Sequence, residues 1–216
     1  MTCPVCGAIT SPHQHPRFDW LFHVCPWCEL IFKDPKHLPS ESESLKQYGF
    51  HQNDCSNQGY VDYLLDFIHQ SVMPFIQSGF VLDYGSGPNP VLATLLKERY
   101  GFDVQIYDLF YANQNQYDHY RYDLITSTEV IEHISDPLST FKEWHALLKP
   151  GGILSVMTLF HSKDLEVFNG WFYIRDTTHL TFYTPKTFEV LAQKTGFKVI
   201  WTNHKRQIVL RRGEDA

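Results

Sequence analysis

Apolar residues change their spacing several times after residue 58, and each change predicts a different element. Short, nearly continuous apolar runs predict buried strands at 80–84, 102–108, 122–128 and 152–159. Apolar positions that recur every three or four residues predict helices at 59–76, 90–100, 137–148 and 184–196. Two final runs, 197–203 and 206–212, predict a closing hairpin. Strands that alternate with helices form a mostly parallel sheet, so we expect a Rossmann-like, doubly wound α/β fold with its ligand at the carboxyl ends of the strands.

Polar, glycine and proline residues predict where these helices begin and end. We expect Asn89 to cap the helix at 90–100, Pro90 to take its first position and Gly101 to end it. Asp136 is expected to cap the helix at 137–148, which the sequence Lys-Pro-Gly-Gly then stops.

Residues 1–38 follow a different pattern, with scattered prolines and too few aliphatic residues to fold without a covalent or metal link. They contain two Cys-x-x-Cys pairs separated by 18 residues. This spacing is typical of a closed structural zinc site with four thiolate ligands, here Cys3, Cys6, Cys25 and Cys28. We therefore predict a zinc ribbon at 1–38, a polar, partly helical linker at 39–57 and an α/β domain at 58–216.

Composition narrows the classes of function. The 216 residues suit one α/β domain with a small appendage, and 43% of them are hydrophobic, which is enough for a packed core. The formal net charge is −6, and the absence of any Lys/Arg block argues against a nucleic-acid groove. The first ten residues contain neither a basic segment nor an apolar run, and no later stretch is long and apolar enough for a membrane helix. We expect a soluble cytoplasmic protein that contacts no membrane.

The turn "VLDYGSGPNPV" at 81–91 carries the first chemical signal. Gly85, Ser86 and Gly87 follow a predicted strand, but the third glycine of the dinucleotide fingerprint and the Gly-Lys-Ser/Thr of a phosphate loop are both missing. Asp83, two residues before the first glycine, would repel a pyrophosphate and attract an ammonium group. The turn therefore predicts a cationic cofactor without phosphates.

An acid, any residue, glycine, any residue and glycine at the end of the first strand resembles the first motif of the class I S-adenosylmethionine-dependent methyltransferases. The resemblance implies that Asp83 lies beside the ammonium group of this cofactor. It also implies that Asp108, which ends the second strand, accepts hydrogen bonds from the ribose hydroxyls. The stretch "YDLITSTEVIEHISDP" is similar to the family's fourth-strand motif and implies that Thr128 and Glu129 flank the methionine end.

The adenine contact is harder to place, because only 13 residues separate Asp108 from Tyr122. This gap leaves little room for a regular third strand. Asn115, Tyr117 and Asp118 are the candidates within it, and we favour Asp118.

With "FKDP" after the second cysteine pair, the chain resembles a bacterial branch of small-molecule methyltransferases that carry an N-terminal zinc ribbon and in some cases modify sugars or natural-product intermediates. The stretch from Asp176 to His179 resembles the D-x-x-H stretch of these relatives. We predict that His179 acts as the base for a small-molecule acceptor, that Asp176 fixes the tautomer of its ring, and that Trp171 and Tyr173 form an apolar wall.

Other roles stay open at this point. His179 and Asp176 are equally suited to a structural latch, in which case His133 or His161 becomes the candidate base. Two other functions also fit the sequence: an RNA methyltransferase whose ribbon reads the substrate, and a protein that binds S-adenosylmethionine without catalysis. The methylated atom and the oligomeric state are not predicted.

Overall fold

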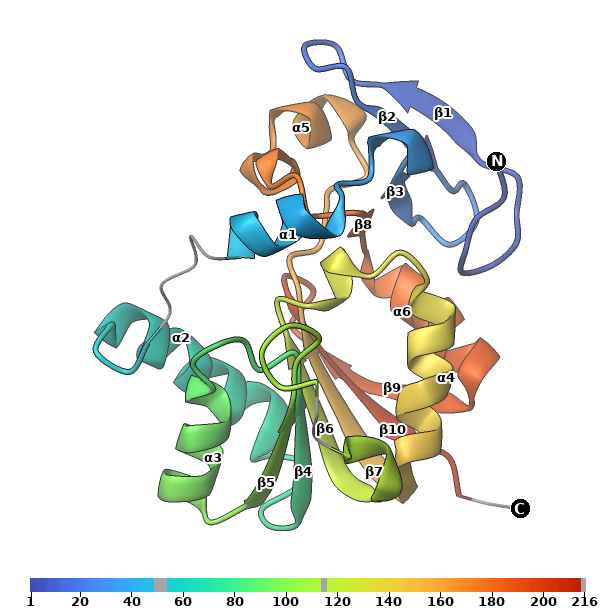
Figure 1. The fold of residues 1–216 in the computed structure, drawn as a ribbon. Coiled ribbons are helices and arrows are strands. Elements are labelled where there is room, and N and C mark those ends of the chain that lie inside the picture. The colour runs from blue at the N-terminus through green and yellow to red at the C-terminus, as the bar shows by residue number, and fades with distance from the viewer. Residues whose placement is uncertain (49–53, 114–115, 215–216) are drawn as a thin grey trace.

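A six-stranded sheet forms the body of the molecule in the computed structural model, which describes residues 1–48, 54–113 and 116–214 (Figure 1). Its strand order is β5-β4-β6-β7-β10-β9. The first four strands pair in parallel, whereas β10 is antiparallel to both β7 and β9. The bounds are β4 (Phe80–Tyr84), β5 (Asp103–Tyr107), β6 (Tyr122–Thr128), β7 (Leu148–Met157), β9 (Phe197–Thr202) and β10 (Gln207–Arg212).

Helices cover both faces of this sheet, which confirms the doubly wound α/β fold (Figure 1). One apolar cluster joins α2 and α3 to the sheet, and another joins α4 and α6 to its opposite face. Helix α2 continues into a five-residue π-helical segment at Ile68–Val72. The bounds are α2 (Gln58–Phe67), α3 (Val91–Tyr100), α4 (Pro137–Leu147) and α6 (Pro185–Thr195).

Most of the predicted helix ends are confirmed, and one is wrong. Asp136 accepts a hydrogen bond from the Ser139 N–H at 3.1 Å, and Gly101 ends α3 in the left-handed conformation with φ 73°. At the start of α3, Pro90 is the N-cap and not the first helical residue, Asn89 is not the cap, and no side chain caps this helix. Strand β7 begins at Leu148 and includes the Lys-Pro-Gly-Gly segment, at which its register with β6 shifts: Leu148 pairs with Tyr122, and the next paired residue is Ile153.

The connection between β5 and β6 contains a short 3-10 helix, Tyr117–His119, and no strand among its described residues. This agrees with the expectation that the gap is too short for a regular third strand. Asn115 lies outside the described residues.

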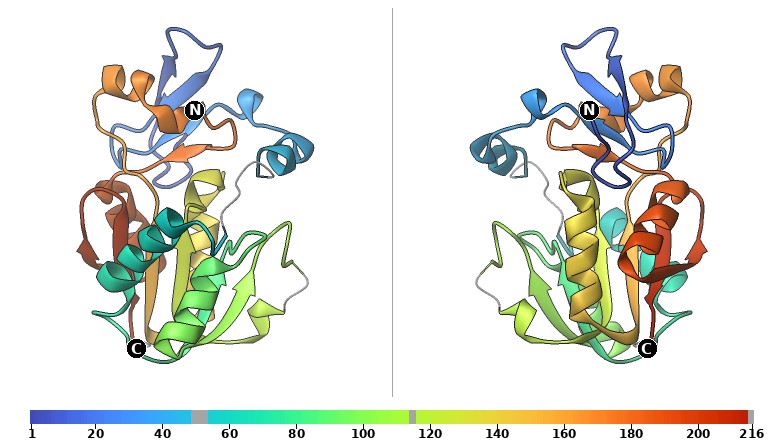
Figure 2. Two further views of the ribbon diagram at one scale, coloured as in Figure 1. Left: turned by 90° about the vertical axis from the view of Figure 1, so that its left-hand side faces the viewer. Right: turned by 90° about the vertical axis from the view of Figure 1, so that its right-hand side faces the viewer.

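A second, four-stranded antiparallel sheet lies above the carboxyl ends of the main strands (Figure 2). Three of its strands are N-terminal, and the fourth, β8, comes from the long segment after β7. Helix α5 of that segment packs on the same layer (Figure 1). The boundary at residue 38 stays a prediction. The elements are β1 (Ser11–Gln14), β2 (Leu21–Val24), β3 (Ile31–Lys33), α1 (Glu41–Tyr48), α5 (Leu165–Gly170) and β8 (Thr181–Phe182).

Aromatic packing holds the two parts of this upper layer together. Phe22 on β2 meets Phe168 on α5 edge to face at a ring-centroid distance of 5.2 Å, and Phe182 on β8 also packs against Phe168, at 5.2 Å. All three side chains are fully buried, and each contributes about 1.5–3 kcal/mol on burial. The predicted ribbon therefore shares a core with residues more than a hundred positions later. No helix in the described residues is long and apolar enough to cross a membrane.

Candidate active site

A cavity of about 650 Å³ lies at the carboxyl ends of β4, β5 and β6, and residues of the segment after β7 also line it. It brings together nearly all of the predicted site residues. Those that line it are Asp83, Gly85, Ser86, Gly87, Asp108, Thr128, Glu129, His133, Asp176 and His179. Asp118 does not line the cavity; it is exposed and lies 3.9 Å from His119.

Asp83, the penultimate residue of β4, lines the cavity and is almost completely buried. The Thr126 hydroxyl on the neighbouring strand donates to its Oδ1 at 3.1 Å. Burial raises the pKa of Asp83 to about 7, because the charged form loses hydration. A cation placed beside this carboxylate would favour its ionised form and would bind well in return.

The glycine turn after β4 needs its glycines. Gly85 has φ 85°, and a Cβ at this position would lie 2.3 Å from a methyl carbon of Val130. Gly87 is also left-handed, with φ 67°, and its N–H donates to Asp108 Oδ2 at 2.9 Å. The other Asp108 oxygen accepts from the N–H groups of Phe110 and Tyr111 at 2.9 and 3.1 Å. Asp108 thus joins the turns after β4 and β5 in one rigid wall.

Aromatic rings flank this wall. The rings of Tyr107 and Tyr117 are 4.1 Å apart at their centroids, and Tyr84 lies 4.8 Å from Tyr107. The Tyr117 hydroxyl donates to Glu143 Oε1 at 2.6 Å, which fixes its position behind Tyr107. Beyond β5, Leu109 lines the cavity and is 62% exposed at its rim. This side of the cavity offers an apolar platform for a flat ring.

Glu129 follows β6 in a strained conformation, because it is a non-glycine residue with φ 54°. Its backbone N–H donates to the Met157 carbonyl at 2.8 Å. Its carboxylate accepts from the Tyr63 hydroxyl at 2.6 Å and lies 2.8 Å from the Tyr173 hydroxyl. These contacts hold Glu129 against the cavity despite the strain.

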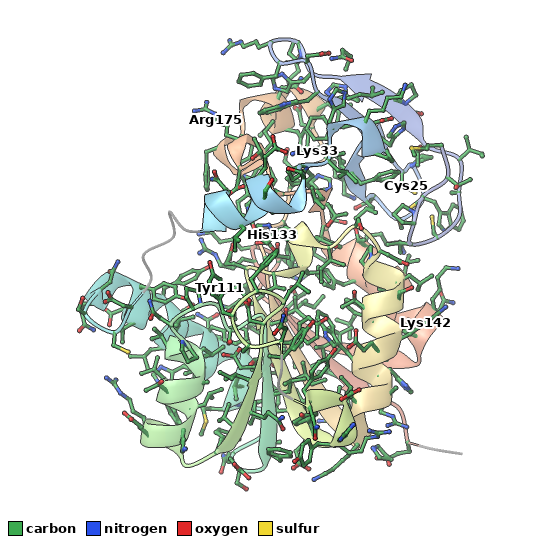
Figure 3. All side chains as sticks on the ribbon, viewed as in Figure 1. Cys25, Lys33, Tyr111, His133, Lys142 and Arg175 are labelled. Atoms are coloured by element: carbon green, nitrogen blue, oxygen red, sulfur yellow. The ribbon has the colours of Figure 1, made fainter. Side chains whose placement is uncertain are left out.

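His133 and His179 meet at the opposite end of the cavity, with ring centroids 4.7 Å apart. His133 Nδ1 lies 3.0 Å from the Thr178 carbonyl, and His179 Nδ1 lies 2.8 Å from the Tyr173 carbonyl. A carbonyl only accepts, so each Nδ1 carries the proton. Figure 3 shows His133 between the upper layer, which carries Lys33, and the lower body near Tyr111.

The expected role of Asp176 needs correction, although the residue lies at the site. Its Oδ2 is 4.0 Å from His179 Nε2, too far for a hydrogen bond, and it is on the wrong side of the ring to hold Nδ1–H. The Tyr173 carbonyl fixes the tautomer instead. Asp176 Oδ1 accepts from the Thr178 N–H and hydroxyl, and these bonds lower the pKa of Asp176 against the effect of burial.

The aromatic wall also differs from the prediction. Tyr173 and Phe172 line the cavity, whereas Trp171 packs behind Tyr173 at a ring-centroid distance of 4.9 Å. Three aromatic residues at the site were not predicted. Phe172 and Tyr60 line the cavity, and the Tyr63 hydroxyl on α2 donates to Glu129, which is 66 positions later. Nothing in their local spacing distinguishes these residues from ordinary helix positions.

Glu132 is the most unusual residue that the sequence analysis did not single out. Its side chain is fully buried, and its Oε1 accepts from the Tyr173 hydroxyl at 2.5 Å. Its Oε2 has no hydrogen-bond partner. Burial and the nearby Glu129 carboxylate raise the pKa of Glu132 well above its usual value. In the sequence, Glu132 could have been noticed from its position in "EVIEH", three residues after Glu129 and next to His133.

His161, the reserve candidate for a base, lies outside the cavity. Its Nε2 faces the Glu29 carbonyl at 2.9 Å, and its Nδ1 faces the Ser162 carbonyl at 2.7 Å. The contact joins the segment after β7 to the second cysteine pair. His161 is therefore placed to brace the upper layer.

The four predicted metal ligands do converge. The sulfur atoms of Cys3 and Cys28 are 3.5 Å apart, those of Cys6 and Cys25 are 3.4 Å apart, and all four lie within 4.8 Å of one another. Tetrahedral zinc with bonds of about 2.3 Å needs sulfur atoms about 3.8 Å apart. Small side-chain adjustments reach this distance, so the residues fit a structural zinc ion.

Both cysteine pairs form the same kind of knuckle. The Gly7 N–H donates to the Cys3 carbonyl at 2.9 Å, and the Glu29 N–H donates to the Cys25 carbonyl at 3.1 Å. Gly7 adopts the required left-handed conformation easily, whereas Glu29 does so with strain at φ 65°. The Glu29 carboxylate accepts from Lys163 at 2.5 Å and from Thr184 at 2.9 Å. These bonds join the strained knuckle to the segment after β7.

Two further contacts link the ribbon to the active-site loop. The buried Lys33 ammonium donates to the Thr177 carbonyl at 2.9 Å, within the stretch that carries Asp176 and His179. The Thr187 hydroxyl at the start of α6 donates to the Cys28 carbonyl at 2.8 Å. The N-terminal module is thus hydrogen-bonded both to the stretch that carries Asp176 and His179 and to the start of α6.

Comparison with known proteins agrees with this arrangement. A family model described as a methyltransferase domain matches residues 56–201. Over 51 residues the chain is 46% identical to a ubiquinone biosynthesis O-methyltransferase of Histophilus somni, and over 50 residues it is 42% identical to that of Actinobacillus pleuropneumoniae. The matches cover 24% and 23% of this chain and only 19% and 21% of those proteins.

Solved structures share the fold at low identity. CalO1, a methyltransferase in calicheamicin biosynthesis, aligns with a TM-score of 0.55 at 14% identity, covering 80% of this chain and 58% of that one. Phosphoethanolamine N-methyltransferase 2 of Haemonchus contortus, in complex with S-adenosyl-L-methionine, aligns with a TM-score of 0.53 at 14% identity, covering 86% and 62%.

Proposed function

This chain belongs to the methyltransferase-domain family, and from that premise we propose that it transfers a methyl group from S-adenosylmethionine to a hydroxyl group of a small-molecule acceptor. One observation carries the proposal. A single cavity contains the acid-flanked glycine turn expected for this cofactor. At its other end the same cavity contains His133, His179 and the Asp176 carboxylate.

The cofactor would occupy the end formed by the turns after β4 and β5. Asp83 would face the ammonium group, and Asp108, already fixed by three backbone N–H groups, would accept from the ribose hydroxyls through its remaining lone pairs. Gly85, Ser86 and Gly87 let the backbone approach the cofactor closely. Thr128 and Glu129 would flank the methionine end, and the apolar rim at Leu109 suits the adenine better than the exposed Asp118 does.

The acceptor would enter between His133, His179 and Phe172. Methyl transfer needs the acceptor oxygen in line with the methyl carbon and the departing sulfur, and it needs water excluded. His179 Nε2 carries the lone pair in the neutral tautomer that Tyr173 fixes, so it is placed to accept the hydroxyl proton. Lys and Arg are both absent from the described residues that line the cavity, which favours an uncharged acceptor over a phosphate or carboxylate.

The N-terminal module would hold one structural zinc ion at Cys3, Cys6, Cys25 and Cys28. Four thiolates that must stay reduced fit a cytoplasmic location, as predicted from the sequence. The net charge of −6 and the absence of Lys and Arg from the described lining of the cavity disfavour RNA as the substrate.

Incubation with methyl-labelled S-adenosylmethionine tests the proposal against a panel of hydroxylated, amino and thiol metabolites and against RNA. We expect label to pass to a hydroxylated small molecule, and Asp83→Ala to abolish both transfer and the heat of S-adenosylhomocysteine binding. Label in RNA would favour the ribbon-as-reader alternative. Binding of S-adenosylhomocysteine without transfer to any acceptor would favour a non-catalytic protein.

A further inference from the structure

We propose that Glu132, His133 and His179 form a binding site for a divalent metal ion, of the Mn²⁺ or Zn²⁺ kind, at the acceptor end of the cavity. Metal binding itself does not depend on the proposed function, but the role that we assign to the metal does. The site is separate from the four cysteines, which lie in the ribbon.

The three side chains already bring their donor atoms together. One ligand atom from each of Glu132, His133 and His179 lies within 4.8 Å of the others. Two ligands on opposite sides of a metal, with bonds of about 2.0–2.2 Å, are separated by about 4.4 Å at most. Small rotations of the side chains therefore suffice to close the site.

Both histidines are oriented as metal ligands usually are. His133 and His179 each direct Nδ1–H at a backbone carbonyl, of Thr178 and of Tyr173 respectively. Such a bond fixes the tautomer, leaves the Nε2 lone pair as the donor and increases the basicity of the ring. The Tyr173 and Thr178 carbonyls belong to the same loop, so the conformation of this loop fixes the orientation of both imidazole rings.

Glu132 supplies an independent observation. Its carboxyl group is fully buried; Oε1 is held by Tyr173, and Oε2 lacks a hydrogen-bond partner. In the described part of the chain, no Lys or Arg forms an ion pair with it or with the nearby Glu129. A buried carboxyl oxygen without a hydrogen-bond partner is costly, and a cation beside Oε2 would remove that cost.

Tyr173 connects these parts. Its hydroxyl contacts Glu132 and Glu129, and its carbonyl holds His179. The ion would thus have one carboxylate and two imidazole ligands on one side. This set of ligands suits Mn²⁺, Fe²⁺ or Zn²⁺ better than Mg²⁺ or Ca²⁺. The remaining coordination positions would face the cavity, which both histidines line.

We infer that the acceptor binds this ion through its hydroxyl oxygen. The metal would orient that oxygen and lower the pKa of the hydroxyl, so that its proton passes to solvent water before the oxygen attacks the methyl carbon and the sulfur departs as a thioether; His179 would then be a ligand instead of a base. The two roles of His179 exclude each other, and metal dependence separates them.

Electron paramagnetic resonance of Mn²⁺ tests the site in the full chain with its ribbon zinc retained. The hard Mn²⁺ ion binds thiolates poorly, so the cysteine cluster does not compete. We expect one bound Mn²⁺ per chain. Glu132→Gln and His133→Asn should weaken it more than tenfold, and Tyr173→Phe, which removes the hydroxyl that holds Glu132, should weaken it about 10- to 100-fold. Glu166→Gln and His119→Asn, both exposed and outside the cavity, are the matched controls.

Binding to the unmodified chain that is absent, or unchanged in Glu132→Gln, would overturn the site. Calorimetry with S-adenosylhomocysteine is run on the same samples: cofactor binding and methyl transfer without Mn²⁺ binding refute the metal alone, whereas Mn²⁺ binding without cofactor binding refutes the proposed function alone. Zinc content, measured in every sample, shows that the ribbon is intact.

Discussion

The two ends of the cavity are built differently. At the cofactor end, Asp83, Gly87 and Asp108 belong to adjacent strand-to-helix turns, and hydrogen bonds between neighbouring turns hold them. At the acceptor end, His133 follows β6, whereas His179 belongs to a loop that the N-terminal ribbon braces through Lys33 and Glu29. The first end needs only the sheet, but the second needs a separate module in place.

This difference predicts which perturbations spare cofactor binding. Damage to the ribbon should reach the acceptor end through Thr177 and Thr184 while the turns after β4 and β5 stay formed. Damage to the turns should act on the cofactor directly.

Removing the ribbon metal should have the largest effect. Cys28→Ser, which removes a ligand of the ribbon only, should unfold the ribbon, because such modules take most of their folding free energy from zinc. We expect methyl transfer to fall to background while calorimetry shows S-adenosylhomocysteine affinity within about threefold of the intact protein. Cys55→Ser, an exposed thiol outside the cluster, is the control. Parallel loss of cofactor binding would show that the two ends are not separable.

His179→Ala should cut turnover by about 10²- to 10⁴-fold, the usual contribution of a proton acceptor or of an equivalent activating group. Cofactor affinity and the thermal midpoint should change little, because the turns after β4 and β5 do not involve this ring. His161→Ala, at a buried histidine outside the cavity, serves as the comparison. A drop in thermal midpoint without a specific loss of turnover would make His179 a structural latch.

Asp108→Ala should weaken cofactor binding by about 1–3 kcal/mol, because it removes a charged acceptor and frees the N–H groups of Gly87, Phe110 and Tyr111. Asp118→Asn should change affinity less than twofold, since Asp118 is exposed and does not line the cavity. Calorimetry with S-adenosylhomocysteine measures both. Equal losses in the two variants would restore Asp118 to the site.

The pH dependence of binding gives the smallest effect. Burial raises the pKa of Asp83 to about 7, and a cationic ligand needs the ionised form. Affinity for S-adenosylmethionine should therefore fall about tenfold between pH 8 and pH 6, and Asp83→Asn should bind weakly at both.

The raised pKa of Asp83 also sets the direction in which the stability of the folded protein changes with pH. Between about pH 4 and pH 7 the folded protein keeps a proton on Asp83 that the unfolded chain has lost. The ligand-free protein should therefore lose stability as pH rises through this window, and Asp83→Asn should flatten the slope in chemical denaturation. An unchanged slope in that variant would assign the titration to another group.

Local spacing along the chain was enough to predict the parts of the protein that lie within one turn or between adjacent turns. The alternation of strands and helices, the turn at Gly85 and the acids that end β4 and β5 were all predicted, because the carboxyl ends of neighbouring parallel strands meet at one edge. The convergence of the four cysteines was also predicted from local spacing. Each Cys-x-x-Cys pair forms a local turn with two thiolates, and two such turns supply the four ligands of one ion.

Tertiary structure alone decided the rest. The bond from Lys33 to Thr177 joins residues 144 positions apart, and β3 pairs on one side with β8, a two-residue strand that no periodic pattern marks. The burial of Glu132 and the choice of Phe172 over Trp171 for the cavity wall depend on how the loop after β7 packs on the ribbon. Spacing along a chain encodes contacts within and between adjacent turns, whereas the docking of two distant segments depends on shape, burial and desolvation that exist only once both have folded.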